Sequence, residues 1–225
     1  MRDAGDPGRW VLAIDTATDQ AGIALLDGDR LHERSWPGSR QQTVTVLPQV
    51  EQVLAEAEAT LSDVSLVAVT IGPGSFTGLR VGLSIAKGIV IAESCALVGV
   101  PTMDVAAEPL VRSGVRCVVV SPAGRGRVIW AAFDPDGEGT APENASFDSF
   151  VDQSSRFGDW IFVAELTTEQ RAILRDAGAN LAPAAASFRR AGVLAEMGLD
   201  RWRRGEVDDA VMLEPAYLHG RPNPR

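Results

Sequence analysis

The chain has 225 residues, of which 45% are hydrophobic and 23% charged, and its formal net charge at pH 7 is −9. This composition is ordinary for a globular protein with a sizeable core, arranged as one large domain or two small lobes. The acidic balance argues against a free-standing nucleic-acid-binding protein, which would carry a basic face.

The N-terminal segment and the cysteines favour a cytoplasmic protein. Residues 1–9 lack the apolar stretch of a secretory leader, and no apolar run approaches the ~20 residues that span a bilayer. Cys95 and Cys117 are far apart and form no paired motif, which predicts two reduced thiols. We expect residues 1–9 and 219–225 to be loose tails.

The first half of the chain predicts one lobe, over residues 10–104. Short apolar runs rich in β-branched residues predict strands, and apolar residues at helical spacing predict helices. The predicted order is strands at 10–15, 21–26 and 30–36, a helix at 41–59, a strand at 66–71, a helix at 76–92 and a strand at 97–100. This is the order of a ribonuclease-H-like lobe, the unit duplicated in the sugar kinase, Hsp70 and actin superfamily. Pro48 should kink the first helix or mark its true start.

Residues 105–218 predict a second, degraded lobe of the same kind. The expected elements are a helix at 101–111, strands at 115–121, 128–133 and 160–163, and helices at 167–177 and 184–204. The last helix belongs to this lobe or packs back on the first. Arg201, Arg203 and Arg204 at its end are expected to interact with the helix dipole rather than with RNA.

Helix 76–92 is apolar over much of its circumference. One stripe begins at Leu79, and a second contains Val81, Ile85 and Ile89. At about 100° per residue the two stripes lie roughly 135° apart. Such a helix is either deeply buried within its own chain or keeps one face for another subunit, and the residues leave both interpretations open.

Two turns invite a phosphate-binding interpretation. Gly72 and Gly74 precede the helix at 76–92, and helix N-termini favour anions, but the spacing fits neither a P-loop nor a dinucleotide fingerprint. Asp15 and Thr16 follow the first strand in a turn without the glycine that close approach to a phosphate requires. These four residues are weak nucleotide-binding candidates, and capping of the turn is the favoured role for Asp15 and Thr16.

The sequence offers no convincing catalytic set. His32 and His219 are the only histidines, near opposite ends of the chain, and neither has partners at metal-ligand spacing. Ser75 does not lie in a Gly-x-Ser-x-Gly motif. Asp208 and Asp209 lie in a polar segment and are predicted to be solvated. We therefore expect no catalytic residues, no metal site and no cofactor.

The segment from Gly72 to Arg80, GPGSFTGLR, follows a VAVT strand and precedes a Gly/Ala-rich helix. It resembles the signature of the TsaB (YeaZ) family, whose members are subunits of the bacterial machinery that makes threonylcarbamoyladenosine next to the anticodon of tRNAs. A closing Pro-x-Tyr-Leu element at 215–218 is also similar to the family. The chain departs from the family pattern at Pro122, Gly124 and His219, where Asp, Arg and Arg are usual.

The resemblance implies an α/β fold of two ribonuclease-H-like lobes and a non-catalytic subunit. Such a subunit pairs with TsaD, the metal- and ATP-dependent partner that transfers threonylcarbamate to tRNA adenosine. It supports assembly with the ATPase subunit TsaE, can homodimerise alone, and meets tRNA only indirectly.

The helices at 41–59 and 76–92 are expected to form a four-helix interface with the same pair in the partner. A stable interface of this kind should bury at least ~1,000 Å². The residues expected in it are Val46, Val50, Val53, Gly78, Val81, Gly82, Ile85 and Ile89. Gly82→Arg should abolish pairing and leave the monomer folded, whereas an unfolded variant would indicate that the helix is buried within its own chain.

Two other functions are alternatives to the subunit interpretation. An ATP-dependent kinase or ATPase of the same superfold would need phosphate loops, and the missing glycine near Thr16 and the presence of Pro122 argue against them. A peptidase is disfavoured by the scarcity of histidine.

Overall fold

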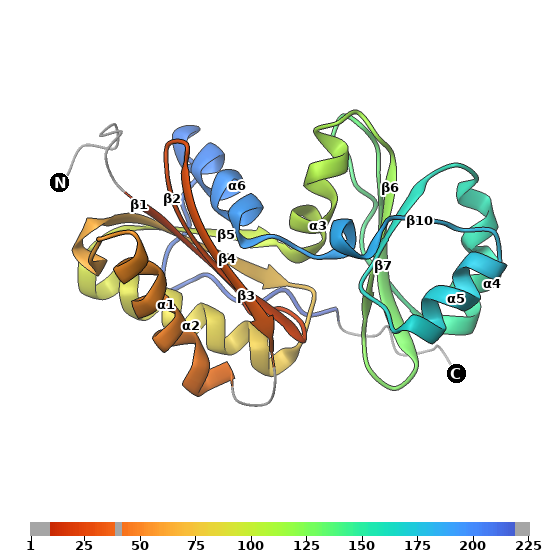
Figure 1. The fold of residues 1–225 in the computed structure, drawn as a ribbon, viewed down its shortest axis with the longest axis horizontal. Coiled ribbons are helices and arrows are strands. Elements are labelled where there is room, and N and C mark those ends of the chain that lie inside the picture. Colours follow the sequence, from red (N-terminus) through yellow and green to blue (C-terminus); the bar gives the residue numbers. More distant parts are fainter. Residues whose placement is uncertain (1–9, 39–41, 219–225) are drawn as a thin grey trace. The chain divides into compact units, whose positions relative to one another are not determined.

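The computed structural model describes residues 10–38 and 42–218. The chain forms two compact units, unit 1 with Met1–Val105 and Arg190–Pro215, and unit 2 with Ala106–Arg189 and Ala216–Arg225 (Figure 1). The sequence suggested a division after residue 104 and placed residues 105–218 together, with the last helix as the uncertain part. In the structure this helix, α6 (Ala191–Arg203), belongs to unit 1. The predicted tails at 1–9 and 219–225 lie outside the described residues.

Unit 1 is built on a five-stranded sheet with the order β3-β2-β1-β4-β5. Its strands are β1 (Trp10–Asp15), β2 (Gln20–Asp27), β3 (Arg30–Pro37), β4 (Val64–Gly72) and β5 (Ala96–Pro101). The first three strands form an antiparallel meander, and β4 and β5 continue the sheet parallel to β1. All six residues of β1 are buried, as expected for a central strand covered on both faces.

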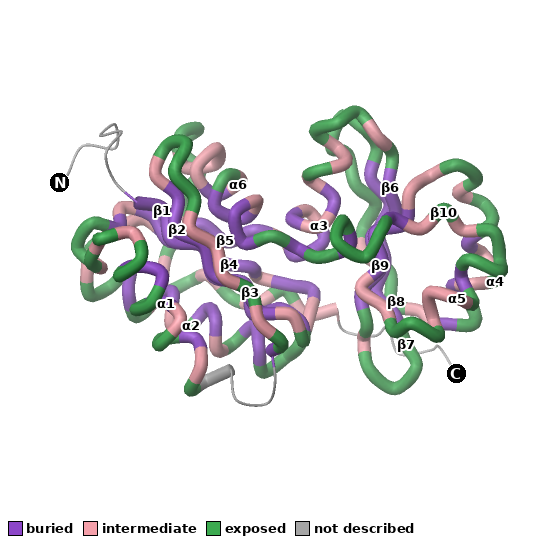
Figure 2. Tube along the Cα trace, in the orientation of Figure 1, coloured by how far each residue is buried: buried purple, intermediate pink, exposed green. Residues whose placement is uncertain are grey.

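Helices cover both faces of this sheet. Helices α1 (Gln42–Glu56) and α2 (Phe76–Glu93) lie on one face, and α6 lies on the other (Figure 1). The short η1 (Leu61–Asp63) leads into β4, and α3 (Thr102–Val111) leads out of the unit. The apolar core is therefore split into two layers by the sheet, and the strands between them appear as the buried centre of the unit in Figure 2.

Unit 2 repeats the same strand order in a reduced form. Its sheet has the order β10-β9-β6-β7-β8, an antiparallel meander of β6, β7 and β8 followed by the parallel strands β9 and β10. The strands are β6 (Cys117–Pro122), β7 (Arg127–Phe133), β8 (Glu143–Ser146), β9 (Ile161–Ala164) and β10 (Asn180–Leu181). The helical elements are α4 (Phe147–Ser154), η2 (Ser155–Phe157), α5 (Thr168–Asp176) and η3 (Ala184–Ser187). The expectation of two similar α/β lobes, the second one degraded, is confirmed.

Three details differ from the sequence-based expectation. The predicted helix at 184–204 is wrong in its first part, because the chain forms only a short 3-10 turn at Ala184–Ser187 and α6 begins at Ala191. Just before α6, the side chain of Arg189 is buried and forms an ion pair with Glu165. The sequence also missed β8, α4 and β10. Helix α1 runs through Pro48 rather than starting there.

None of the helices in the described part of the chain combines the length and apolar character that crossing a membrane requires.

Candidate functional site

Hydrogen bonds join the turn that follows β1 to the turn that follows β4. The two strands are parallel neighbours, so their carboxyl ends meet at one edge of the sheet. Asp15 Oδ1 accepts hydrogen bonds from the backbone N–H of Ala17 and from the hydroxyl of Thr70, both at 3.0 Å. The hydroxyl of Thr16 donates to the carbonyl of Gly78 at 2.7 Å. Since Asp15, Thr16 and Thr70 are all buried, these bonds connect the turn after β1 to the start of α2 inside the unit.

Gly74, in the signature segment, and Gly82, two residues after it, allow this close approach. A Cβ at Gly74 would lie 2.2 Å from the carbonyl oxygen of Ala17, and a Cβ at Gly82 would lie 2.2 Å from Thr16 Oγ1. The N–H of Ser75 also donates to the carbonyl of Ala17 at 2.6 Å. The glycines therefore let the first turns of α2 pack directly against the turn after β1.

The structure brings the four weak nucleotide-binding candidates together, and polar groups of Asp15, Thr16 and Gly72 bond to the protein itself. Besides the bonds of Asp15 and Thr16, the N–H of Gly72 donates to the hydroxyl of Thr102 at 3.1 Å. Within residues 10–38 and 42–218 no group of three or more His, Cys, Asp or Glu side chains is placed to hold a metal ion. In this arrangement the two turns cap each other through hydrogen bonds within the protein.

Six of the eight residues expected at a partner interface point into unit 1. Val46, Val50, Val53 and Ile89 belong to the apolar core between the helices and the sheet, and Gly78 and Gly82 are buried residues of α2. The placement has a simple cause, because the side of α1 with these valines is the side that covers the sheet. These six residues are therefore not accessible to a partner in this structure, and only Val81 and Ile85 are partly exposed.

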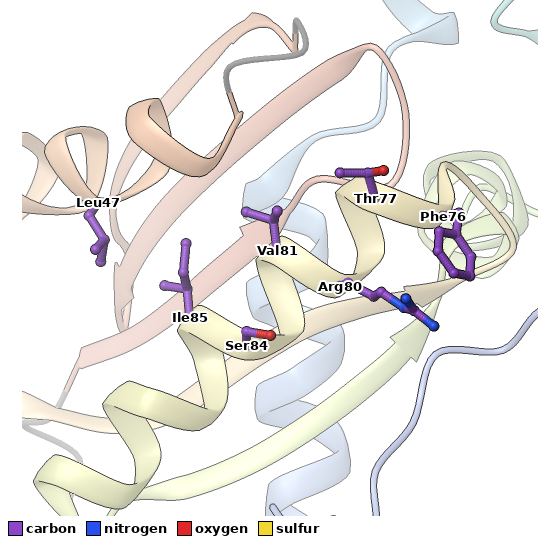
Figure 3. Close-up of a pocket in the computed structure, with 7 residues that line it drawn as sticks. All are labelled: Leu47, Phe76, Thr77, Arg80, Val81, Ser84 and Ile85. Atoms are coloured by element: carbon purple, nitrogen blue, oxygen red, sulfur yellow. The ribbon is translucent and has the colours of Figure 1, made fainter.

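The open side of α1 and α2 forms a groove of about 480 Å³. It is lined by Leu47 of α1 and by Phe76, Thr77, Arg80, Val81, Ser84 and Ile85 of α2 (Figure 3). We name this surface the α1–α2 groove. Apolar side chains supply most of its lining, which is the composition of a surface that excludes water when covered.

Exposed apolar side chains mark the same surface. Phe76 is 54% exposed and Leu47 is 47% exposed, although both are large hydrophobic residues. The guanidinium of Arg80 stacks 3.7 Å above the Phe76 ring, one helical turn away, which holds the aromatic ring at the end of the groove. Burying these two side chains against a partner would stabilise a complex by about 25 cal/mol per Å² of apolar surface covered.

The sequence missed Leu47, Phe76 and Arg80 as residues of this surface. It recognised the stripe of Val81 and Ile85 as a second apolar face of α2, and Phe76 and Arg80 extend that face toward the helix N-terminus. The i, i+4 spacing of an aromatic residue and an arginine is the signal that could have identified them.

Other candidate residues have structural partners or lie elsewhere. His32 packs edge-on against the ring of Trp10, at a centroid distance of 5.8 Å, and His219 lies outside the described residues. Burial raises the pKa of Cys117 to about 12, and burial with the nearby Glu93 charge raises the pKa of Cys95 to about 11. Both thiols are therefore protonated at neutral pH and are poor nucleophiles.

The arginines at the end of α6 are paired with acidic side chains. Arg201 and Arg204 both donate to the carboxylate of Glu206, and these hydrogen bonds lower the pKa of that carboxyl. Arg203 lies 4.0 Å from Asp200. These acidic partners offset the positive charge of the three arginines, which argues against a basic surface for RNA.

Comparison with known proteins identifies relatives of this chain. The family model described as TsaD, tRNA N6-adenosine threonylcarbamoyltransferase, matches residues 37–186. The chain is 28% identical over 223 residues to the tRNA threonylcarbamoyladenosine biosynthesis protein TsaB of Escherichia coli (strain K12), a match covering 92% of this chain and 94% of that protein. It is 38% identical over 128 residues to an uncharacterized protein of Mycobacterium leprae (strain TN), covering 55% of this chain and 35% of that protein.

A solved structure has the same fold. YeaZ from Pseudomonas aeruginosa superposes with a TM-score of 0.74 at 21% sequence identity, covering 93% of this chain and 100% of that chain. At this level of identity the likeness concerns the fold.

Proposed function

Because the chain belongs to the TsaD family, and within it to the TsaB (YeaZ) group that takes part in tRNA threonylcarbamoyladenosine biosynthesis, we propose that it is a non-catalytic scaffold subunit. Its fold is the two-lobed α/β fold of the sugar kinase, Hsp70 and actin superfamily, as the sequence led us to expect.

The proposed partner is the TsaD-type transferase subunit, and the proposed contact surface is the α1–α2 groove. The observation that supports it is an apolar groove with Leu47 and Phe76 exposed, on the outer side of two helices over which residues 10–38 and 42–218 form no further layer. Through this pairing the chain supports assembly with a TsaE-type ATPase, acts in the cytoplasm, and meets tRNA only indirectly. The same groove would serve a homodimer when the partner is absent.

The hydrogen-bonded turns favour this proposal over the ATP-dependent alternative. A phosphate-binding turn offers its backbone N–H groups to the ligand. Here the N–H of Ala17 donates to Asp15, and Ser75 N–H donates to Ala17 C=O.

The Gly82→Arg variant does not test this proposal, because an arginine there would clash with Thr16 inside the unit. Leu47→Asp is the better variant, since it places a charge in the α1–α2 groove at a position that is already 47% exposed. Ile173→Asp is the matched control, because Ile173 is 43% exposed on α5 of unit 2.

The experiment is light scattering on a sizing column with the TsaD-type subunit of the same genome. We expect a one-to-one complex that Leu47→Asp weakens by at least about tenfold, since a buried unpaired carboxylate costs more than 1.4 kcal/mol. Ile173→Asp should leave the complex unchanged. Absence of a complex with the natural chain, or equal effects of the two variants, would contradict the proposal.

A further inference from the structure

The most exposed large apolar side chains in the described part of the chain belong to α2 and to the segment after α6. Val211 is 81% exposed, Met212 is 74% exposed, and Ile91 on α2 is 71% exposed. The amino group of Lys87 on α2 donates to the carbonyl of Val211 at 3.4 Å, and Ile91 lies one turn after Lys87 on the same helix face. The three exposed side chains therefore lie on the same side of unit 1.

Asp209 holds residues 209–213 in one turn, which we name the 209–213 turn. Its Oδ1 accepts from the N–H groups of Val211 and Met212 at 2.6 and 3.2 Å, and its carbonyl accepts from the N–H of Leu213 at 2.9 Å. Ala210 and Leu213 pack on the apolar core of unit 1, whereas Val211 and Met212 are open to solvent. The two exposed side chains are therefore preorganised, and covering them would cost little conformational entropy.

The α1–α2 groove is too small to be the whole contact with a stable partner. Seven residues line it, whereas a stable interface uses about 20–30 residues a side. Helix α2 carries the surface onward, because one outward stripe has the i, i+4, i+7 and i+11 spacing of a single helix face and consists of Arg80, Ser84, Lys87 and Ile91. Its first half lines the groove (Figure 3), and Lys87 reaches the 209–213 turn.

The groove and the 209–213 turn are thus two apolar areas on either side of the α2 stripe. A partner that covers both must also cover the ammonium group of Lys87. A covered ammonium group is costly unless a carboxylate pairs with it. The surface therefore fits a partner with apolar side chains for the two areas and an acidic side chain between them.

We propose that the TsaD-type subunit crosses the outer face of α2 and binds the 209–213 turn as well as the α1–α2 groove. It places apolar side chains on Val211 and Met212 and a carboxylate on Lys87. This inference rests on the proposed function, and it adds a second contact area and the chemistry of the partner surface that fits it.

Oxidation of Met212 by hydrogen peroxide measures whether the turn is covered. In the isolated chain, diluted until light scattering shows a monomer, Met212 should form the sulfoxide readily because its side chain is open to solvent. A saturating amount of the TsaD-type subunit of the same genome should slow this oxidation at least about fivefold, measured by mass spectrometry. Unchanged oxidation within a mixed complex that light scattering detects would overturn the inference and leave the proposed function standing.

Substitution of Lys87 tests for the partner carboxylate. Lys87→Gln keeps a donor for the Val211 carbonyl but removes the charge, so it should weaken the mixed complex about tenfold and reduce its salt dependence. Lys87→Arg keeps both the donor and the charge and should preserve most of the affinity. Equal affinity and equal salt dependence of Lys87→Gln and the natural chain would overturn the inference.

Substitution of Met212 separates the turn from the groove. Met212→Asp should weaken the mixed complex about tenfold, whereas Ile173→Asp on unit 2 should not. If Leu47→Asp weakens the complex and Met212→Asp does not, the inference is wrong and the groove contact remains. If Met212→Asp changes only the self-association of the isolated chain, a second copy occupies the turn and the inference is wrong. Absence of any mixed complex would contradict the proposed function and the inference together.

Discussion

Thr16 and Gly82 form a close contact between the turn after β1 and helix α2. Thr16 is fully buried, its hydroxyl donates to Gly78, and its Oγ1 occupies the space where a side chain at position 82 would begin. Gly88 lies in the same helix, but a Cβ there would meet nothing within 4 Å. The two interior glycines of α2 therefore have different physical reasons to be present.

Because of this difference, replacing glycine by alanine should change the free energy of unfolding in opposite directions at the two positions. Gly82→Ala should lower the free energy of unfolding by about 2 kcal/mol, because the added methyl group overpacks the contact with Thr16. Gly88→Ala should raise it by about 0.5–1 kcal/mol, since alanine favours the helix and clashes with nothing. Urea unfolding followed by tryptophan fluorescence measures both. Equal changes in the two variants would show that the contact with Thr16 is not what fixes Gly82.

Among the elements, the helices differ in how their ends are defined. Helix α5 begins with a complete capping box, in which Thr167 accepts from the N–H of Gln170 and the Gln170 side chain accepts from the N–H of Thr167, both at 3.2 Å. Helix α6 begins at Ala191, its N-cap residue Arg190 makes no side-chain cap bond, and the helix packs on the sheet instead. A local signal therefore marks the start of α5, whereas only tertiary contacts mark the start of α6.

The contribution of the α5 capping box to stability can be measured with two substitutions. Thr167→Ala should destabilise unit 2 by about 1 kcal/mol, because the N–H of Gln170 in the first turn of α5 loses its acceptor. Thr168→Ala changes the same residue type one position later, at the first residue of the helix, and should stay within about 0.5 kcal/mol of the natural chain. Thermal unfolding compares the two variants. A larger loss in Thr168→Ala would mean that the helix starts elsewhere.

At the scale of the whole molecule, two units with separate cores share one chain. The core of unit 2 is centred on Phe150, which is fully buried with ring contacts to Trp130 at 5.7 Å and to Phe162 at 6.3 Å. The residues of this core and of the two layers in unit 1 do not overlap. Each unit therefore buries its own apolar surface, as an independently stabilised lobe does.

A cavity made in one core should therefore destabilise only the unit that contains this core. Phe150→Ala should cost about 3–5 kcal/mol, because it removes a buried ring. Amide protection measured by hydrogen exchange should fall in β6, β7 and β9 and persist in β1, β2 and β4. Phe188→Ala, at a residue that is 50% exposed, is the control and should change little. Loss of protection in both units would show that they unfold as one cooperative body.

The amino-acid sequence by itself determined most of the elements and their order. Strong periodicity located the strands of unit 1 and helix α2 to within a few residues, and the run from Gly72 to Arg80 carried the family resemblance. Short or irregular elements such as β10 and α4 were not predicted, because two to eight residues carry too little periodicity to be distinguished from loops.

Only the tertiary structure decided which apolar face of α1 and of α2 packs on the sheet and which face stays open. Helical spacing shows that Val81 and Ile85 share a face, and that the valines of α1 share another. It does not show which face packs on the sheet when a helix is apolar on both sides. The buried hydroxyl of Thr16 also depends on a contact 62 residues away in sequence, which no local pattern encodes. For these reasons Leu47 and Phe76, rather than the valines of α1, line the open groove.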